Sequence, residues 1–159
     1  MEFYNQENYE KYFEDGKIYY DYMFYIASPF FNEEQIDRVE RIKKVLDEKG
    51  LAYYSPKDDF QVQENATKQE REKCFLNNLM AIQSSCFVLV VTDGKDMGTI
   101  FEAGYSYAFK KPIVYFAETL GDNPFNLMLA ESGIAVLRST DELKDIEVVD
   151  LNGYTGKIE

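Results

Sequence analysis

The sequence predicts an α/β domain built on a doubly wound parallel sheet of five strands. Short apolar runs alternate along the chain with helical patterns, which is typical of strand–helix–strand units with parallel strands. The run FVLVV at 87–91 is apolar and β-branched, as expected for a central strand that is buried on both faces. The length of 159 residues suits a single domain with a sizeable core.

Each predicted element is bounded by turn or capping residues. The first strand, 23–27, stops at Pro29, and a helix over 33–49 follows with Asn32 as its N-cap. The second strand, 51–55, is closed by Pro56, and the polar segment 57–68 is predicted to be a loop. The remaining predictions are helices over 69–84, 99–110 and 125–130 and strands over 87–91, 112–116 and 133–137.

The two ends of the chain lack a clean period. We interpret residues 1–22, which are rich in Tyr, Glu and Asn, as an N-terminal extension before a domain that spans 23–159. The aromatic residues of this extension could pack on the domain or on a neighbouring subunit, or could stack on bases; they are Phe3, Tyr4, Tyr9, Tyr12 and Phe13. The tail from Ser139 is acidic, and no further element is assigned to it.

Composition excludes several classes of function. Lys and Arg total 17 and Asp and Glu total 29, so the net charge is −12, which argues against nucleic acid or an anionic membrane as a partner. The chain shows no membrane span and no signal peptide. Cys74 and Cys86 lie far apart and are predicted to be free, buried thiols, which fits a cytoplasmic location. No histidine is present, which removes His-based triads and the common zinc sites, and no metal or cofactor is expected.

The segment TDGKDMGTIFEAGYSYA at 92–108 places two carboxylates, Asp96 and Glu102, directly after the central strand. Ligands of open α/β sheets bind in the crevice at the carboxyl ends of the strands. We expect Glu102 in the first turn of a helix that begins near Thr99, where the helix dipole and backbone N–H groups would keep it ionised. In the alternative interpretation, Asp93 and Asp96 only form the turn and Glu102 only complements the dipole.

Five pieces of the sequence, in order, resemble the nucleoside 2-deoxyribosyltransferase family. They are Tyr25 to Gln35, the YSPKD of 54–58, the DMGTxxExGY of 96–105, the PFNLM of 124–128 and the YxG of 154–156, and together they cover nearly all of the chain after Phe24. The resemblance implies a flavodoxin-like fold and a homo-oligomer built from dimers, either a dimer or a hexamer. It also implies cleavage of the N-glycosidic bond of a 2′-deoxynucleoside, through a covalent 2-deoxyribosyl–enzyme intermediate that passes to a free nucleobase. Such an activity belongs to nucleotide salvage.

The resemblance also implies roles for matching residues. Glu102 falls on the nucleophile, Asp96 on a carboxylate that binds the sugar, and Tyr25 on a tyrosine that holds the nucleophile. Asn126 matches an asparagine that reaches the sugar 5′-hydroxyl in the neighbouring subunit's site. The terminal carboxylate of Glu159 matches a tail that closes the site.

Other candidate substrate-binding residues surround these. Gly98 and Met128 lie within the matching motifs and are predicted to contact the substrate. The aromatic rings of Phe30, Phe31 or Phe60 could sandwich the base, with roughly 1–3 kcal/mol of stacking energy. Phe30 and Phe31 could instead pack in the core or at a subunit interface.

The main departure from the family pattern is Asn78, which stands where the family usually has an aspartate near the nucleobase. An amide can hydrogen-bond a base edge but cannot donate a proton as a general acid. Either Asp58 or Asp59 then protonates the leaving base, or activation of the leaving group is weak.

Two other functions stay open. A hydrolase of the same superfamily could act on nucleosides or on nucleoside 5′-monophosphates. The first loop, SPFF at 28–31, has no basic residue for a phosphate, although Ser28 and Ser106 could contribute hydroxyl groups. A non-catalytic nucleoside-binding module is favoured mainly by Asn78. Preference for purine or pyrimidine bases stays open as well.

Overall fold

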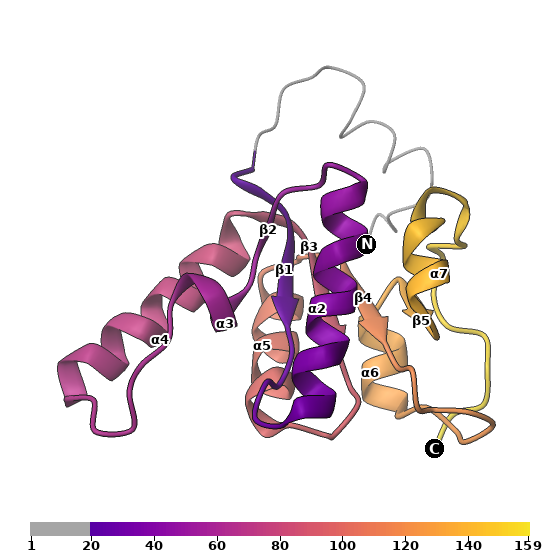
Figure 1. Ribbon diagram of the computed structural model, residues 1–159. Helices are drawn as coiled ribbons and strands as arrows, with labels where there is room; N and C mark the ends of the chain where they lie inside the picture. The colour runs from indigo at the N-terminus through magenta and orange to yellow at the C-terminus, as the bar shows by residue number, and fades with distance from the viewer. Residues whose placement is uncertain (1–19) are drawn as a thin grey trace.

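Five parallel strands form one sheet in the order β2-β1-β3-β4-β5. The structure, a computed structural model, describes residues 20–159 (Figure 1). The strands are β1 (Tyr22–Ala27), β2 (Tyr53–Tyr54), β3 (Ser85–Val91), β4 (Ile113–Phe116) and β5 (Ala135–Leu137). This order is that of the flavodoxin-like fold, in which the chain reverses direction across the sheet between β1 and β3. The predicted single-domain α/β fold with a five-stranded parallel sheet is therefore confirmed.

Helices cover both faces of the sheet (Figure 1). On one face lie α2 (Glu33–Glu48), α7 (Thr140–Lys144) and the 3₁₀ turn η1 (Ile146–Val148). On the other face lie α4 (Lys68–Gln83), α5 (Met97–Ala108) and α6 (Leu127–Ser132), and the short helix α3 (Pro56–Asp59) links β2 to the segment before α4. The outer part of α4 extends beyond the sheet, at the left of Figure 1, and several of its apolar side chains are exposed.

The strands divide their side chains between the two faces. Phe24 and Ile26 of β1 point into the core under α2, whereas Tyr25 and Ala27 point into the core under α4 and α5. This alternation follows from the period of two residues in a strand. It places the Tyr25 ring, which is fully buried, on the same side of the sheet as α5.

Several predicted boundaries are corrected. The segment 57–68 is not entirely loop, because α3 occupies its start, with Pro56 in the first turn, where a proline is tolerated. The third long helix begins at Met97 and not near Thr99, because the side chain of Asp96 caps it by accepting a hydrogen bond from the Thr99 N–H group. Glu102 therefore lies in the second turn and not the first.

The acidic tail also contains structure that the sequence did not indicate. Ser139 caps α7 by accepting a hydrogen bond from the Glu142 N–H group, and Leu143 of α7 is buried against α2. The last residues return to the domain, since Phe125 and Ile158 form a parallel β-bridge.

Other findings concern only residues 20–159. Within this part of the chain no helix is both long and apolar enough to cross a membrane. The same residues contain no cluster of His, Cys, Asp or Glu suited to a metal ion. Cys86 is a buried free thiol as predicted, whereas Cys74 is free but only half-buried. The predicted role of the N-terminal aromatic residues falls on positions 1–19, outside the described residues.

Candidate active site

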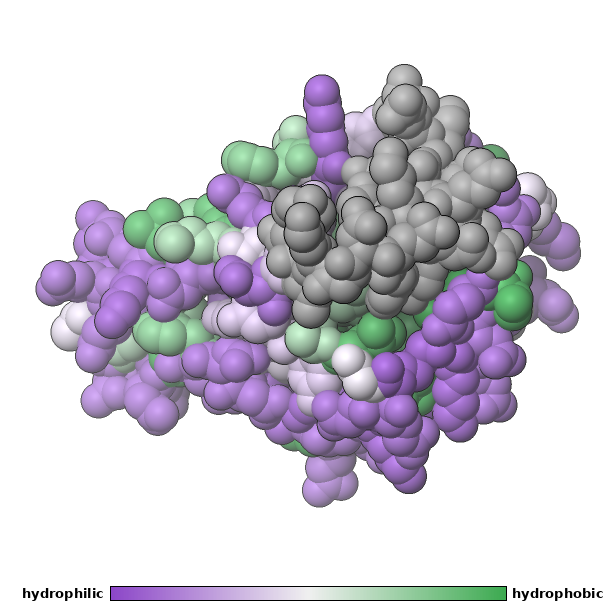
Figure 2. Space-filling model, turned by 90° about the horizontal axis from the view of Figure 1, so that it is seen from above, coloured by the Kyte–Doolittle hydropathy of each residue, from purple (hydrophilic) through white to green (hydrophobic). Residues whose placement is uncertain are grey.

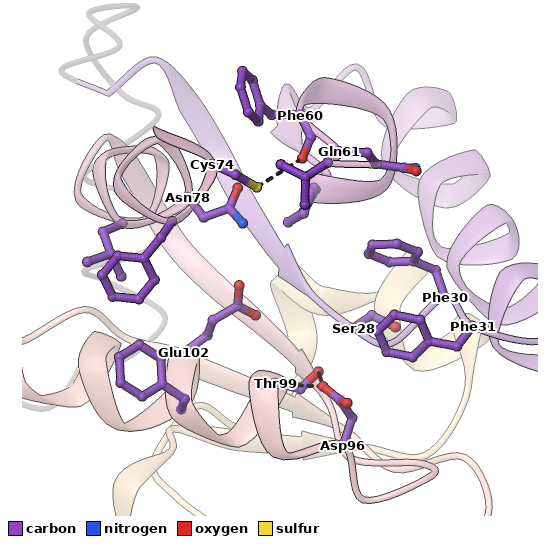
Figure 3. Close-up of a pocket in the computed structure, with 16 residues that line it drawn as sticks. Ser28, Phe30, Phe31, Phe60, Gln61, Cys74, Asn78, Asp96, Thr99 and Glu102 are labelled. Atoms are coloured by element: carbon purple, nitrogen blue, oxygen red, sulfur yellow. Dashed lines mark hydrogen bonds between the residues drawn. The ribbon is translucent and has the colours of Figure 1, made fainter. Parts of the chain in front are cut away.

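A cavity of about 350 Å³ opens beyond the carboxyl ends of β1 and β3 and continues between α4 and α5 (Figure 3). Its walls come from four parts of the chain: the loop after β1, the segment from α3 to 62, the inner face of α4, and the start of α5. This position is the crevice where flavodoxin-like sheets bind ligands. The volume lies within the range of small-molecule sites.

Glu102 of α5 reaches into this cavity and is held from below by Tyr25 of β1. The Tyr25 hydroxyl group donates a hydrogen bond of 2.5 Å to Glu102 Oε1. Burial, and the proximity of the Glu102 charge, raise the pKa of Tyr25 far above its usual value, so the phenol stays protonated and acts as a donor. The hydrogen bond fixes the position of the Glu102 carboxylate, and the phenol adds no charge to the site.

The environment of Glu102 changes its acidity. Protein atoms surround most of the side chain, and desolvation raises the pKa of Glu102 to about 7. The hydrogen bond from Tyr25 lowers it, and the nearby negative charge of Asp96 raises it further. The expectation that Glu102 lies in the first turn of the helix is wrong, and burial opposes the ionisation that the helix dipole was expected to maintain.

Asp96 lies at the same cavity and also starts helix α5. Its Oδ2 accepts hydrogen bonds from the Thr99 N–H group at 2.7 Å and from the Thr99 hydroxyl group at 2.9 Å. Among residues 20–159, the other oxygen, Oδ1, has no hydrogen-bond partner and is available to a ligand hydroxyl group. Gly98 packs against this carboxylate, because a Cβ atom there would lie 3.2 Å from Oδ2.

Aromatic side chains form the mouth of the cavity. The rings of Phe30 and Phe31 lie 5.2 Å apart, and Phe31 is 73% exposed. Among residues 20–159, neither ring belongs to the core or packs against it. Phe60 lines the cavity on the opposite side, below the ammonium group of Lys73.

Asn78 of α4 faces Glu102 across the cavity (Figure 3). Its amide oxygen accepts a hydrogen bond of 3.2 Å from the Tyr54 hydroxyl group. The two carboxylates that were considered as alternative proton donors, Asp58 and Asp59, do not lie beside Asn78. Asp58 is paired with Lys43, and Asp59 accepts a hydrogen bond from the Ser55 N–H group, and neither lines the cavity.

Three predicted site residues lie elsewhere in the same chain. Asn126, Met128 and Glu159 line a second hollow of about 740 Å³ between the loops after β3 and β4 and the start of α6. The Leu127 N–H group donates to a main-chain oxygen of Glu159 at 3.1 Å, so the end of the chain lies beside Asn126. Within one chain this hollow shares no residue with the cavity that holds Glu102.

Sequence reasoning missed several cavity residues on α4 and α5. Phe75, Leu79 and Cys74 line the cavity, and Leu79 also packs against the core. Phe75 contacts Phe101 with their ring centroids 5.8 Å apart. The spacing of 74, 75, 78 and 79 puts these side chains on one helical face. This spacing could have identified them as cavity residues, since it places them on the same face of the helix as Asn78.

Comparisons with known proteins show the family and the fold. The family model described as nucleoside 2-deoxyribosyltransferase matches residues 24–138. A 2-deoxyribosyltransferase from Bacillus psychrosaccharolyticus superposes with a TM-score of 0.73 at 30% identity, covering 83% of this chain and 98% of that chain. No curated protein matches the chain.

Two more distant structures share the fold. A conserved protein from Enterococcus faecalis gives a TM-score of 0.60 at 19% identity, covering 78% of this chain and 95% of that chain. The CMP N-glycosidase BcmB from Clostridium botulinum gives a TM-score of 0.53 at 17% identity, covering 77% of this chain and 94% of that chain.

The fold and these matches define the class of protein: an enzyme with the flavodoxin-like sheet order. Within that class, the chain belongs to the nucleoside 2-deoxyribosyltransferase family.

Proposed function

We propose that this protein transfers 2-deoxyribose from a 2′-deoxynucleoside to a free nucleobase. The observation that carries the proposal is the hydrogen bond of 2.5 Å from Tyr25 to Glu102, which aims a carboxylate into a cavity with an aromatic mouth. Enzymes that replace a glycosidic bond with retention use such a carboxylate as the nucleophile.

In the proposed reaction, the nucleobase lies between the aromatic residues at the mouth and Asn78, and a sugar hydroxyl group binds Asp96. Ionised Glu102 attacks the anomeric carbon, and the bond to the base nitrogen breaks. The resulting 2-deoxyribosyl ester with Glu102 is then attacked by the nitrogen of a second base. Loss of the first base leaves the outer part of the cavity open for the second one.

We further propose that the enzyme is a homo-oligomer with shared active sites. Three side chains of α4 are strongly exposed although they are apolar: Phe75, Leu76 and Met80. In Figure 2 hydrophobic atoms lie among hydrophilic ones at the left, where α4 extends. Exposed apolar surfaces of this kind mark protein interfaces. A second copy bound here would bring its Asn126 and Glu159 toward the Glu102 cavity, which a single chain leaves open.

Base exchange tests the proposed activity. The protein is incubated with thymidine or deoxyinosine, with and without adenine, and the products are separated by chromatography. We expect deoxyadenosine only when adenine is present, and we expect its loss in Glu102→Ala. Release of free base at equal rates with and without adenine would identify a hydrolase. No reaction with any deoxynucleoside would contradict the catalytic proposal.

Mixed oligomers test the shared site. If the sites are shared, Glu102→Ala and Asn126→Ala should each lose activity. The first variant lacks the nucleophile, and the second lacks the side chain that contacts the sugar in the neighbouring subunit's site. After the two variants are unfolded together and refolded, some sites combine an intact Glu102 with an intact Asn126, and we expect activity to return. Refolding each variant alone is the control. Lack of recovery in a mixture that is shown to be oligomeric would contradict sharing.

A hydrolase of nucleoside 5′-monophosphates has less support. Among the described residues, those that line the cavity include neither lysine nor arginine. Ser106, which could have supplied a hydroxyl group, is fully buried and donates its hydrogen bond to the Glu102 carbonyl group. A phosphate dianion there would lack the charged partners that such groups normally have.

A further inference from the structure

We propose that Asn78, oriented by Tyr54, donates an amide N–H to an acceptor atom of the nucleobase, and that the base departs as an anion without a proton from the protein. The inference rests on the proposed transferase function and narrows its substrates. It selects nucleosides whose base carries an acceptor facing Asn78 and forms a stable anion on departure.

The orientation of Asn78 is set from outside the cavity. The Tyr54 hydroxyl group lies 3.2 Å from Asn78 Oδ1 and is its donor. Tyr54 itself is held by ring contacts, since it stacks on Tyr25 at 5.5 Å and meets the edge of Tyr22 at the same distance. Burial raises the pKa of Tyr54 to about 12, so the hydroxyl group keeps its proton. Tyr54 is therefore a positioning residue.

With its oxygen engaged, Asn78 presents its nitrogen to the ligand. Figure 3 shows the amide nitrogen on the side of the side chain that faces Glu102 and the open cavity. An amide NH₂ group carries only donors. A base edge with a carbonyl oxygen or an unprotonated ring nitrogen satisfies it, whereas an edge that presents only N–H groups does not.

Proton donors are lacking at the base end of the described cavity. Its ionisable lining groups are Asp96, Glu102 and Cys74. Asp96 is bound to Thr99 at the start of α5, and Glu102 must be a carboxylate to act as the nucleophile. The Cys74 thiol points to the Phe60 carbonyl group at 3.7 Å, and its pKa is raised by burial. None of the three is placed to protonate a base that rests on Asn78.

The chemical step balances without an acid. A bond forms between a Glu102 carboxylate oxygen and the anomeric carbon, while the bond from that carbon to the base nitrogen breaks. The bonding electron pair stays on the base, which leaves with one negative charge as the carboxylate loses its own. The charge spreads to the acceptor atom bound by the Asn78 N–H, and the anion takes a proton from water after it departs.

The rate should then follow the acidity of the leaving base. Turnover of 2′-deoxyuridines that carry fluorine, hydrogen or methyl at C5 is measured under the same conditions. We expect the fluoro substrate to react about tenfold faster than the methyl substrate, or more, because unassisted departure is sensitive to leaving-group basicity. In Asn78→Asp, the introduced carboxyl group can donate a proton, so the methyl substrate should gain most and the ratio should fall toward one.

Matched variants and a binding measurement complete the test. Asn77→Asp adds the same charge to α4 at a residue that does not line the cavity, and it should keep the wild-type ratio. Binding of free 5-fluorouracil is measured by calorimetry. We expect it to weaken about tenfold in Asn78→Leu, which removes the donor, and severalfold in Tyr54→Phe, which keeps the ring and releases the amide.

The outcomes separate the two proposals. If transfer occurs but the substituent has no effect, or Asn78→Asp keeps the wild-type ratio, the inference is overturned and the transferase function stands. If no nucleoside reacts but the base binds and Asn78→Leu weakens binding, the function fails while the recognition role of Asn78 stands. Binding that is unchanged in Asn78→Leu overturns that recognition role, whatever the turnover.

Discussion

Tyr25 and Glu102 are 77 positions apart in the sequence, yet the hydroxyl group of one lies 2.5 Å from the carboxylate of the other. A donor at this distance stabilises the ionised carboxylate, whereas burial destabilises it. Burial has the larger effect, since the pKa of Glu102 is raised to about 7. Burial therefore favours the protonated form of the proposed nucleophile, and the hydrogen bond from Tyr25 opposes it.

Tyr25→Phe should move the pH dependence of base exchange. The wild-type rate is expected to rise with pH through the Glu102 pKa of about 7, because only the carboxylate attacks. Without the phenol, that pKa should rise further, so activity falls most at low pH and recovers at high pH. Tyr22→Phe, which leaves the Glu102 hydrogen bond intact, is the control. A profile that stays in place would contradict this role of Tyr25.

Glu102→Gln should stabilise the fold at high pH while abolishing transfer. The folded-state pKa of about 7 lies above the ordinary pKa of 4.5 for a glutamate, so the contribution of Glu102 to stability is complete below about pH 4.5 and is lost as the pH rises through 7. The shift corresponds to about 3 kcal/mol, which access of solvent to the cavity reduces to about 2.

Urea unfolding at two pH values measures this effect. We expect Glu102→Gln to be more stable than the wild type by about 2 kcal/mol near pH 8 and equal to it near pH 4.5. Glu142→Gln, on the opposite side of the sheet, controls for the change in net charge. An equal effect of Glu102→Gln at both pH values would show that the carboxyl group titrates normally.

Gly98→Ala should lower activity with little effect on folding. The new Cβ atom would lie 3.2 Å from Asp96 Oδ2, so the carboxylate that caps α5 and faces the cavity must shift. We expect base exchange to fall by about tenfold or more, because small displacements of a positioning group are costly in rate. Steady-state kinetics and thermal unfolding together measure the two effects.

Gly104→Ala is the matched control on the same helix. A Cβ atom at 104 meets nothing within 4 Å, so the change should stabilise α5 by about 0.5–1 kcal/mol. If Gly98→Ala and Gly104→Ala affected activity equally, the contact with Asp96 would not explain the result.

Arg38→Ala should destabilise the protein without a direct effect on the site. The Arg38 side chain is buried and lies 3.0 Å from Glu118 and 3.8 Å from Asp93. Its removal leaves Glu118 paired with Arg41 but deprives the buried Asp93 of the cation beside it, at a cost of about 3 kcal/mol in the free energy of unfolding. Lys44→Ala, which breaks an exposed pair at 3.9 Å, should cost less than about 0.5 kcal/mol. Similar losses in both variants would mean that burial does not matter here.

Local patterns were enough to predict the sheet and part of the site. Strands β1 and β3 are buried on both faces of the sheet, so each is a continuous apolar run that can be recognised in the sequence. Asp96 and Glu102 could be placed at the same site because both lie directly after the central strand, at the start of one helix. The start of that helix was misplaced because the Asp96 side chain, and not Thr99, supplies the cap.

The remaining features depend on contacts that no local pattern encodes. Phe75 and Leu79 lie on the same face of α4 and line the cavity, but Leu79 also packs against the core, whereas Phe75 is half exposed because the outer part of α4 extends past the sheet. The link between Tyr54 and Asn78 joins residues 24 positions apart through the packing of β2 against α4. Helix α7 is short and acidic, and one buried leucine, Leu143, fixes it to α2.

Because Phe31 is exposed at the mouth of the cavity, this position is suited to a fluorescent probe of base binding. The sequence contains 13 tyrosines and no tryptophan. Phe31→Trp would therefore introduce a single indole fluorophore beside the incoming base, with excitation separable from that of every tyrosine. Stacking of a nucleobase on that ring would quench its emission. Arrival of the first base, its departure and arrival of the second could then be followed in stopped flow as separate phases of one signal.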